Sequence, residues 1–206
     1  MKSIITAIAV LLTLGVSAQT YVGAKVGPSF TRLKYKTGAK DFYTLSNSFG
    51  AFIEHGYSKG MVIGAELLFE NRRSKVDNNP TDNLGNPLPS ASMHHGFYTA
   101  SMPLYVGFKS TLKTVYISAT LGVIPALSLT EYFVLKGYPN DELNKRSSFS
   151  SSHFDLSPIV NLGAGVSVKR LQIGLQSRYQ QSVIGITTAG AKTNAISAFL
   201  SVGYKL

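Results

Sequence analysis

The chain of 206 residues contains no cysteine and no tryptophan, and only 15% of its residues are charged. Without cysteine it has no disulfide framework and no thiolate metal site. Its 11 Tyr and 11 Phe exclude an intrinsically disordered chain, because disorder goes with many charges and few aromatics. An ordinary soluble domain has about 25% charged residues. The chain is therefore short of the groups that keep a protein surface wet.

Acidic residues are also scarce, since 20 Lys and Arg face only 10 Asp and Glu and leave a formal net charge of +10. Such an excess of positive charge is found in many nucleic-acid-binding proteins. Here, however, the basic residues are dispersed along the chain and form no cluster of the kind that contacts nucleic acid. We therefore expect no nucleic-acid partner.

The first eighteen residues have the pattern of a secretory signal peptide. Lys2 precedes an apolar run from Ile4 to Gly15, and the small residues at positions 16–18 form a cleavage site. The run is shorter than the roughly 20 apolar residues that a membrane-spanning helix needs. We predict a signal peptide over residues 1–18, a mature domain over residues 19–206 and no lipid anchor, because no cysteine follows the cleavage site.

Apolar residues alternate with small or polar ones along the whole mature chain, with the period of a β-strand. The segments from Val115 to Val123 and from Ile196 to Leu206 are the clearest cases. No later apolar run is long enough for a transmembrane helix. The alternation predicts eight strands, over residues 22–30, 49–53, 61–69, 98–108, 115–123, 160–168, 171–178 and 196–206.

The connections between these strands alternate between short and long. Tight hairpins are expected at residues 57–60, 110–113 and 169–170, and long polar links at 34–46, 75–93, 131–152 and 181–193. All long links then lie at one end and both termini at the other. This layout predicts an all-β fold, an eight-stranded antiparallel up-and-down transmembrane β-barrel. A closed sheet also satisfies every backbone polar group in lipid.

A soluble lipocalin-like barrel would have the same strands, so the two faces of the sheet must be told apart. Its outer face would need many charged side chains, whereas the polar positions here are mostly Gly, Ser, Thr and Gln. We therefore assign the apolar face to lipid and the polar face to a narrow, filled lumen. The inward set contains Glu66, Gln172, Gln176 and Arg178, and near the short turns Lys25, Lys109, Lys169 and Lys205. Glu66 and Arg178 are expected to form a structural ion pair.

The outward aromatic residues fall into two groups, as expected for the belts at two membrane interfaces. The belt near the long links contains Phe30, Phe49, Phe69, Tyr98 and Tyr179, and the belt near the short turns contains Phe108 and Tyr204.

Pro103 and Pro125 lie within predicted strands, where each removes a ladder hydrogen bond and predicts a bend or a strand end.

Short motifs at residues 23–27, 50–52, 64–69, 102–105, 154–156, 163–165 and 203–206 are spread over the mature chain. Together they resemble the PorT-like outer membrane β-barrel family of Bacteroidetes, a family of small porin-like proteins. The resemblance implies an eight-stranded barrel in the outer membrane of a Gram-negative bacterium, with periplasmic termini. Some members of that family serve protein secretion. The chain departs from the usual pattern because it ends in Leu206 instead of an aromatic residue, which leaves Tyr204 to fill that role.

Two histidine-containing motifs raise alternatives that involve chemistry. His94 and His95, with Asp77 and Asp82 upstream, have the side-chain types of a Zn or Cu site, but no fixed ligand spacing supports it. Ser152, His153 and Asp155 are the residue types of a hydrolase. Adjacent residues on a strand point to opposite faces, however, so Ser152 and His153 do not pair through proximity in sequence. We therefore predict no metal, no cofactor and no catalytic residue.

A third motif, Gly163-x-Gly165, is a fragment of a dinucleotide-binding fingerprint, but it lacks the third glycine and the helix. It is better explained by small residues on the lumen side of a strand, where bulky neighbours approach.

The expected function is that of a non-enzymatic integral outer-membrane barrel. Outer-membrane lipid would contact its strands, and a protein or glycan partner would contact its extracellular loops, either in surface interaction or in support of protein secretion. A small passive pore and a soluble ligand-binding barrel remain as alternatives. The pore is disfavoured because an eight-stranded barrel is only wide enough to be filled by its own side chains.

Overall fold

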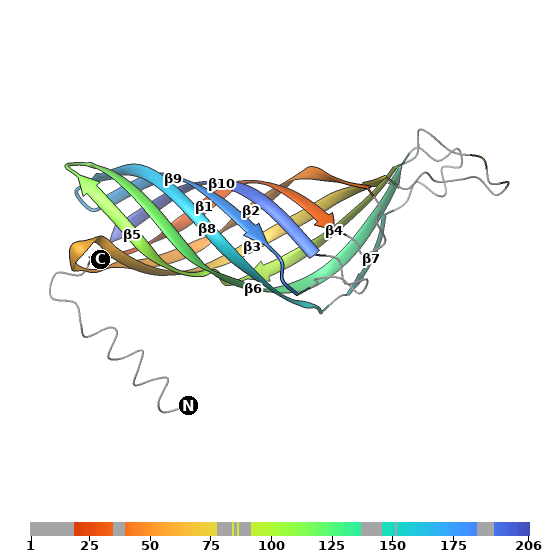
Figure 1. The fold of residues 1–206 in the computed structure, drawn as a ribbon, viewed down its shortest axis with the longest axis horizontal. Coiled ribbons are helices and arrows are strands. Elements are labelled where there is room, and N and C mark those ends of the chain that lie inside the picture. The colour runs from red at the N-terminus through yellow and green to blue at the C-terminus, as the bar shows by residue number, and fades with distance from the viewer. Residues whose placement is uncertain are drawn as a thin grey trace, which may run out of the picture.

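The computed structural model describes residues 19–34, 40–77, 84, 86, 92–136, 146–150, 152–184 and 192–206. The predicted signal peptide lies outside these residues. The described residues form ten strands and one short 3-10 helix (Figure 1). The strands are β1 (Gln19–Lys34), β2 (Lys40–Gly56), β3 (Met61–Asp77), β4 (Ser92–Ser101), β5 (Leu104–Leu112), β6 (Val115–Lys136), β7 (Arg146–Ser150), β8 (Phe154–Val168), β9 (Leu171–Gln181) and β10 (Lys192–Lys205), and the helix η1 is Ser58–Gly60.

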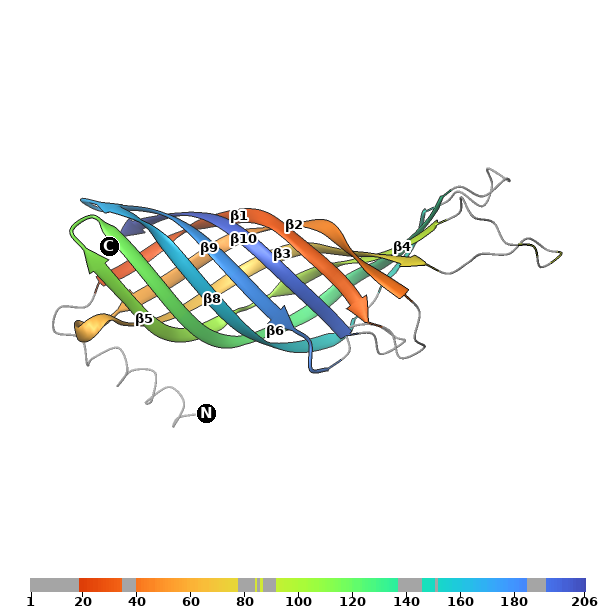
Figure 2. The same ribbon diagram turned by 45° about the horizontal axis from the view of Figure 1, so that its top comes forward.

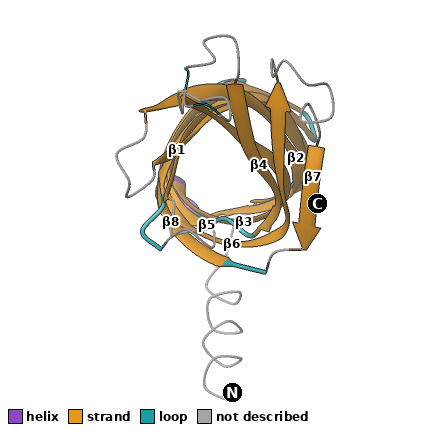
Figure 3. Ribbon diagram, turned by 90° about the vertical axis from the view of Figure 1, so that its right-hand side faces the viewer, coloured by secondary structure: helices purple, strands orange, loops and turns teal. Residues whose placement is uncertain are grey.

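Ten strands occupy eight positions in the wall of a closed barrel. β4 and β5 share one position, because both pair with β3 on one side and with β6 on the other. β7 and β8 share another, since β7 pairs with residues 130–134 of β6 and β8 with residues 115–127. β1 pairs antiparallel with β10 and closes the ring (Figure 3). The predicted fold class, an eight-stranded antiparallel up-and-down barrel, is confirmed.

A row of paired residues can be followed around the whole wall. It starts at Ile117 on β6 and returns to β6 at Leu127, ten residues farther along the strand. Such a displacement over eight wall positions corresponds to a strand tilt of about 40°. All members of the row are apolar, and the larger ones are 42–67% exposed. Between its two ends lie Ala164, Leu175, Leu200, Val26, Phe49, Phe69 and Ala100.

The inside of the barrel has the opposite character. Most of its buried side chains are polar or charged, and the described residues form only two small apolar clusters. One contains Tyr105, Ile124, Ala126 and Ile159, and the other contains Leu33 and Phe97. The barrel therefore has an apolar outer face and a polar interior, the reverse of a soluble barrel.

The short connections are at one end of the barrel, together with the start of β1 and the end of β10. β5 and β6 are joined by the two residues Lys113–Thr114, and β8 and β9 by Lys169–Arg170. In both turns the lysine has a positive φ of 55°. We call this the short-turn end, and the opposite end, where β1, β3, β6 and β9 finish, the long-link end (Figure 2).

The strands are longer at the long-link end than the sequence pattern predicted. β2 begins at Lys40, β6 runs to Lys136, and β7 lies inside a segment that we expected to be a polar link. The added part of β6 contains a bulge: Tyr98 pairs with Thr130 and Thr99 with Ser128, so Leu129 is an extra residue. The bulge reverses the alternation of faces.

The two prolines behave differently from each other. Pro103 does separate β4 from β5, as predicted, and its carbonyl accepts a hydrogen bond from the Glu66 N–H at 2.9 Å. Pro125 was expected to bend or end a strand, but β6 continues through it in register with β8. Continuity is preserved because Pro125 lies beside the break at Pro103, and its own carbonyl accepts the Met102 N–H.

Within the described residues, no helix is long and apolar enough to cross a membrane.

Candidate functional site: the polar lumen

A cluster of charges crosses the centre of the lumen. Glu66 of β3 lies between two cations: its Oε1 is 2.6 Å from Lys25 Nζ, and its two carboxylate oxygens each accept a 2.8 Å hydrogen bond from Arg178 Nη2. All three side chains are at most 3% exposed. Two neutral groups complete the cluster, because Lys25 also donates to Gln176 and Arg178 Nε donates to Asn161. The central cluster thus connects β1, β3, β8 and β9 across the barrel.

Aromatic rings surround these cations. Lys25 Nζ lies 5.5 Å from the ring centre of Phe52 and 5.3 Å from that of Phe199. The Arg178 guanidinium lies 5.1 Å from the same Phe199 ring. A ring face attracts a desolvated cation, so Phe199 compensates both cations of the central cluster.

A second cluster, the upper cluster, lies nearer the long-link end. Arg72 Nη2 binds Glu70 Oε2 at 2.5 Å, and Nη1 lies 3.7 Å from Asp155 Oδ2. Asp155 is fully buried and also accepts a 2.5 Å hydrogen bond from Ser182. Ser101 Oγ donates to Glu70 at 3.2 Å. Each buried charge of this cluster has an opposite charge beside it, as burial in a low-dielectric interior requires.

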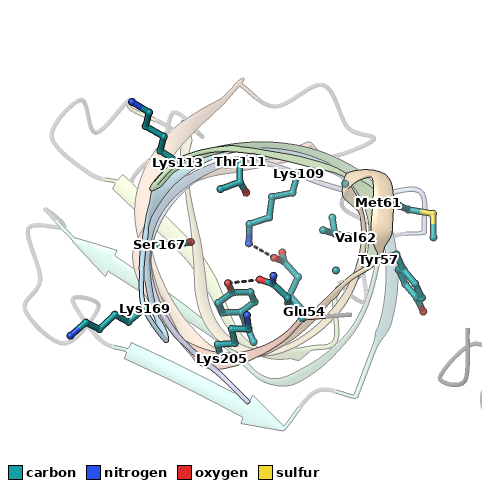
Figure 4. A pocket seen from close by; sticks show the side chains of 14 residues that line it. Glu54, Tyr57, Met61, Val62, Lys109, Thr111, Lys113, Ser167, Lys169 and Lys205 are labelled. Carbon is teal, nitrogen blue, oxygen red and sulfur yellow. Dashed lines mark hydrogen bonds and ion pairs between the residues drawn. The ribbon is translucent and has the colours of Figure 1, made fainter. Parts of the chain in front are cut away.

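A cavity of about 470 Å³ opens at the short-turn end (Figure 4). At its floor Lys109 Nζ donates to Glu54 Oε1 at 2.7 Å and to Gln172 Oε1 at 2.8 Å. The rings of Tyr21 and Tyr116 lie 4.8 and 4.4 Å from the same ammonium group. Lys109 is therefore already neutralised by the protein itself.

The cavity does not continue as a channel through the described part of the barrel. Beyond Lys109 and Glu54 the next space measures about 30 Å³, room for about one or two water molecules. The central cluster and then the upper cluster follow. In the described part of the barrel, side chains therefore fill the lumen beyond the mouth cavity.

The predicted inward residues have the following places. Glu66, Gln172 and Arg178 are buried in the lumen, and the predicted ion pair between Glu66 and Arg178 is present. Gln176 accepts a hydrogen bond from Lys25. Lys169 was expected to point inward, which is wrong: Figure 4 shows Lys169 and Lys113 directed away from the cavity. Lys169 belongs to the two-residue turn, where the positive φ ends the strand alternation.

The aromatic residues assigned to the two belts all lie on the outer face, and each is 39–68% exposed. Phe108 and Tyr204 lie near the short-turn end, four and one residues from the end of their strands. Toward the long-link end lie Phe30, Phe49, Phe69, Tyr98 and Tyr179, and the rings of Phe49 and Phe69 stack at 5.8 Å.

In the two histidine motifs, His95 and Asp155 make buried contacts with other side chains. His95 Nε2 lies 2.6 Å from Glu131 Oε1, and the ring stacks on Phe133 at 4.1 Å. The described residues contain no group of three or more His, Asp or Glu with metal-site geometry. Asp82 and the side chain of Asp77 lie outside the description. Asp155 of the hydrolase candidate is held by Arg72 and Ser182, as described above.

Gly165 agrees with the expectation that small residues permit close approach. A Cβ at Gly165 would lie 2.7 Å from the Tyr116 ring, and one at Gly163 would lie 2.6 Å from the Ser118 hydroxyl. The sequence pattern missed the inward aromatics Tyr21, Phe52, Tyr105, Tyr116 and Phe199. The alternation did indicate them, because each lies on the same face of the sheet as Lys25, Glu66 or Arg178. They were missed because a polar lumen was assumed to contain only small and polar residues.

No protein-family model matches the chain, and no curated protein matches it. Several solved structures have a similar arrangement of strands. Ail, the attachment invasion locus protein of Yersinia pestis, is 11% identical with a TM-score of 0.45, over 91% of this chain and 99% of that one. Neisserial surface protein A is 15% identical with a TM-score of 0.44, over 90% and 98%. The outer membrane protease OmpT of Escherichia coli is 10% identical with a TM-score of 0.40, over 92% and 96%. Similarities at this level assign neither a family nor an activity to this chain.

Proposed function

We propose that this protein is a non-enzymatic integral outer-membrane barrel with a closed lumen, and that it acts by presenting its long-link end to a partner outside the cell. The short turns and both chain ends would then face the periplasm, in the usual orientation of such barrels.

The observation that carries the membrane assignment is the apolar row that encircles the wall. Large side chains such as Leu175 and Ile117 are more than 60% exposed in it, and water would make such a surface very unfavourable. Along β10, Ile196 and Tyr204 are eight residues apart, which is about 20 Å along the barrel axis at a tilt of about 40°. The apolar bands of outer-membrane barrels are about 25 Å tall.

The central cluster supports a closed lumen over the alternative of a small pore. Lys25, Glu66 and Arg178 fill the cross-section with paired charges, and none of them is more than 3% exposed. An ion could pass only by separating these pairs. In planar-bilayer recordings we expect no stable conductance steps, and large, reproducible steps would restore the pore.

A sheet extension at the long-link end supports the role in partner contact. The upper ends of β3, β4 and β6, together with β7, continue beyond the ends of β1 and β10 (Figure 2). Side-chain contacts join its strands: the Tyr132 hydroxyl is 2.7 Å from the Asn71 amide, and the Tyr132 ring contacts Tyr98 at 5.6 Å. Within the described residues β7 pairs with β6 alone. An open strand edge offers backbone donors and acceptors to an extended protein segment.

The experiment that tests the membrane assignment is cell fractionation, followed by gel electrophoresis in SDS with and without boiling. We expect the protein in the outer-membrane fraction and a change of mobility on boiling, because closed membrane barrels stay folded in SDS until heated. A soluble periplasmic protein without a mobility change would mean that the apolar face does not contact lipid.

Some members of the PorT-like family, which the sequence resembles, serve protein secretion. A role in secretion is therefore the first partner function to test. Deleting the gene would then reduce the amount of exported cargo proteins in the medium. Normal export would direct the search to surface recognition, with binding of the purified barrel to host or bacterial glycans and proteins as the measurement.

A further inference from the structure

We propose that the outer face of the β8–β9 turn is a binding site for an anionic glycerophospholipid of the membrane leaflet at the short-turn end. The proposal rests on the membrane assignment above. The site has two parts, a groove for an acyl chain and a pair of cations for the phosphate group.

The groove lies on the outer surface of the wall and has a volume of about 520 Å³. It contains β8, β9 and β10 side chains that the strand register brings side by side, with Val166 opposite Ile173 and Leu171 opposite both Val168 and Tyr204. These side chains are 42–55% exposed. A concave apolar surface of this kind fits a hydrocarbon chain better than a flat wall does, because more atoms of the chain are in contact.

Two adjacent cations, Lys169 and Arg170, border the groove at the end nearest the periplasm. Arg170 Nη1 donates a 3.1 Å hydrogen bond to the Tyr204 hydroxyl, which holds the guanidinium beside the groove. Lys169 is directed away from the mouth cavity (Figure 4). No acidic side chain is among the described residues that line the groove. The charge at this end therefore complements a phosphate, which guanidinium groups bind well.

The backbone of the turn provides a matched control for Lys169. Its φ of 55° is in the left-handed region, where Asn or Gly is favoured and a lysine costs about 1 kcal/mol. Lys113 has the same φ in the other two-residue turn, but Thr114 follows it instead of an arginine. The two turns form a natural matched pair.

The absence of tryptophan allows a direct test with single fluorescent probes. Val202→Trp places a probe beside the groove, because Val202 pairs with Ile173 and is 45% exposed. Val106→Trp places a control on β5, 50% exposed and remote from the β8–β9 turn. Each variant is reconstituted into vesicles that contain brominated phosphatidylglycerol or brominated phosphatidylcholine at equal mole fraction. Bromine quenches only lipid-contacting tryptophan.

We expect phosphatidylglycerol to quench the probe at position 202 at least twofold more strongly than phosphatidylcholine, and the two lipids to quench the probe at position 106 equally. Lys169→Asn combined with Arg170→Gln should remove the preference at position 202. The Asn fits the left-handed turn, so the double variant keeps its fold. Lys113→Asn should leave the preference unchanged.

The outcomes separate this proposal from the membrane assignment. Equal quenching by both lipids at both positions means that the barrel is inserted but has no anionic lipid site. A preference that survives Lys169→Asn with Arg170→Gln also overturns the proposed site. Absence of quenching at both positions means that the strands do not contact lipid, and the membrane assignment fails first.

Discussion

Glu66 is the residue on which the interior depends most, because a single carboxylate balances two buried cations. Replacing it with Gln keeps the volume and removes the charge, so Lys25 and Arg178 would repel each other in a place without water. We expect Glu66→Gln to lower the free energy of unfolding by about 3–5 kcal/mol, measured by urea titration in detergent micelles.

The matched control is Glu54→Gln in the mouth cavity. Glu54 also binds a lysine, but its side chain is 13% exposed while that of Glu66 is not exposed at all. Water can therefore solvate the remaining Lys109, and the loss in the free energy of unfolding should be clearly smaller than for Glu66→Gln. Equal losses for the two variants would contradict the view that burial gives the central cluster its importance.

Phe199 makes a separate contribution, since its ring lies near both cations of the central cluster. Phe199→Leu keeps an apolar side chain but removes the ring face, and we expect a loss of about 2 kcal/mol in the free energy of unfolding. Phe49→Leu on the outer face is the control, because Phe49 has no cation near its ring in the described structure. A loss at Phe49 as large as that at Phe199 would show that ring area, not the cation contact, is decisive.

Within a strand, the packing of a neighbouring side chain can exclude every residue except glycine. In β3, only glycine fits at position 64, because a Cβ would lie 2.3 Å from the ring of Tyr105, whose hydroxyl is bound to Glu54. Gly64→Ala would force that ring to move, and we expect a loss of about 1–3 kcal/mol in unfolding experiments.

Gly163→Ala is the comparison on β8. Its Cβ would meet only the Ser118 hydroxyl at close range, and a hydroxyl can rotate. This variant should change the free energy of unfolding by much less than Gly64→Ala does. A larger effect at Gly163 would mean that the packing of Tyr105 does not limit β3.

At the scale of the strands, the sequence pattern predicted which residues form the wall and which face each turns outward. Alternation was sufficient there because one face contacts apolar atoms and the other polar ones throughout. The pattern failed at the long-link end, where the bulge at Leu129 shifts Glu131 to the inside beside His95. A bulge adds one residue without any change in composition, so a period-two pattern contains no sign of it.

The candidate site was less accessible from the sequence than the wall. Glu66 and Arg178 could be paired because each is the only inward charge in its predicted strand, 61–69 or 171–178. Glu70, Arg72 and Asp155 were missed, since they lie beyond the segments that alternate clearly. Their contacts depend on the tilt and register of the whole barrel, which only the closed structure provides.

The molecule as a whole has a definite hydrophobic height, and this height predicts its preferred bilayer. The distance of about 20 Å along β10 is less than the roughly 30 Å core of an average bilayer. We expect the purified chain to fold in higher yield into vesicles of lipids with 10–12 carbon chains than into vesicles of 18-carbon lipids. The heat-dependent shift on SDS gels measures the folded fraction, and a yield that rises with chain length would contradict the assigned band.

The pairing of β1 with β10 has a consequence for how the protein is made. Tyr21 pairs with Lys205, so the wall closes between the two ends of the chain. Until the last strand has arrived, a growing barrel has two open strand edges and an apolar outer face, which invite aggregation. We therefore expect the chain to depend on protection from self-association until the barrel has closed. The final fourteen-residue strand, β10, is the segment whose arrival ends that dependence.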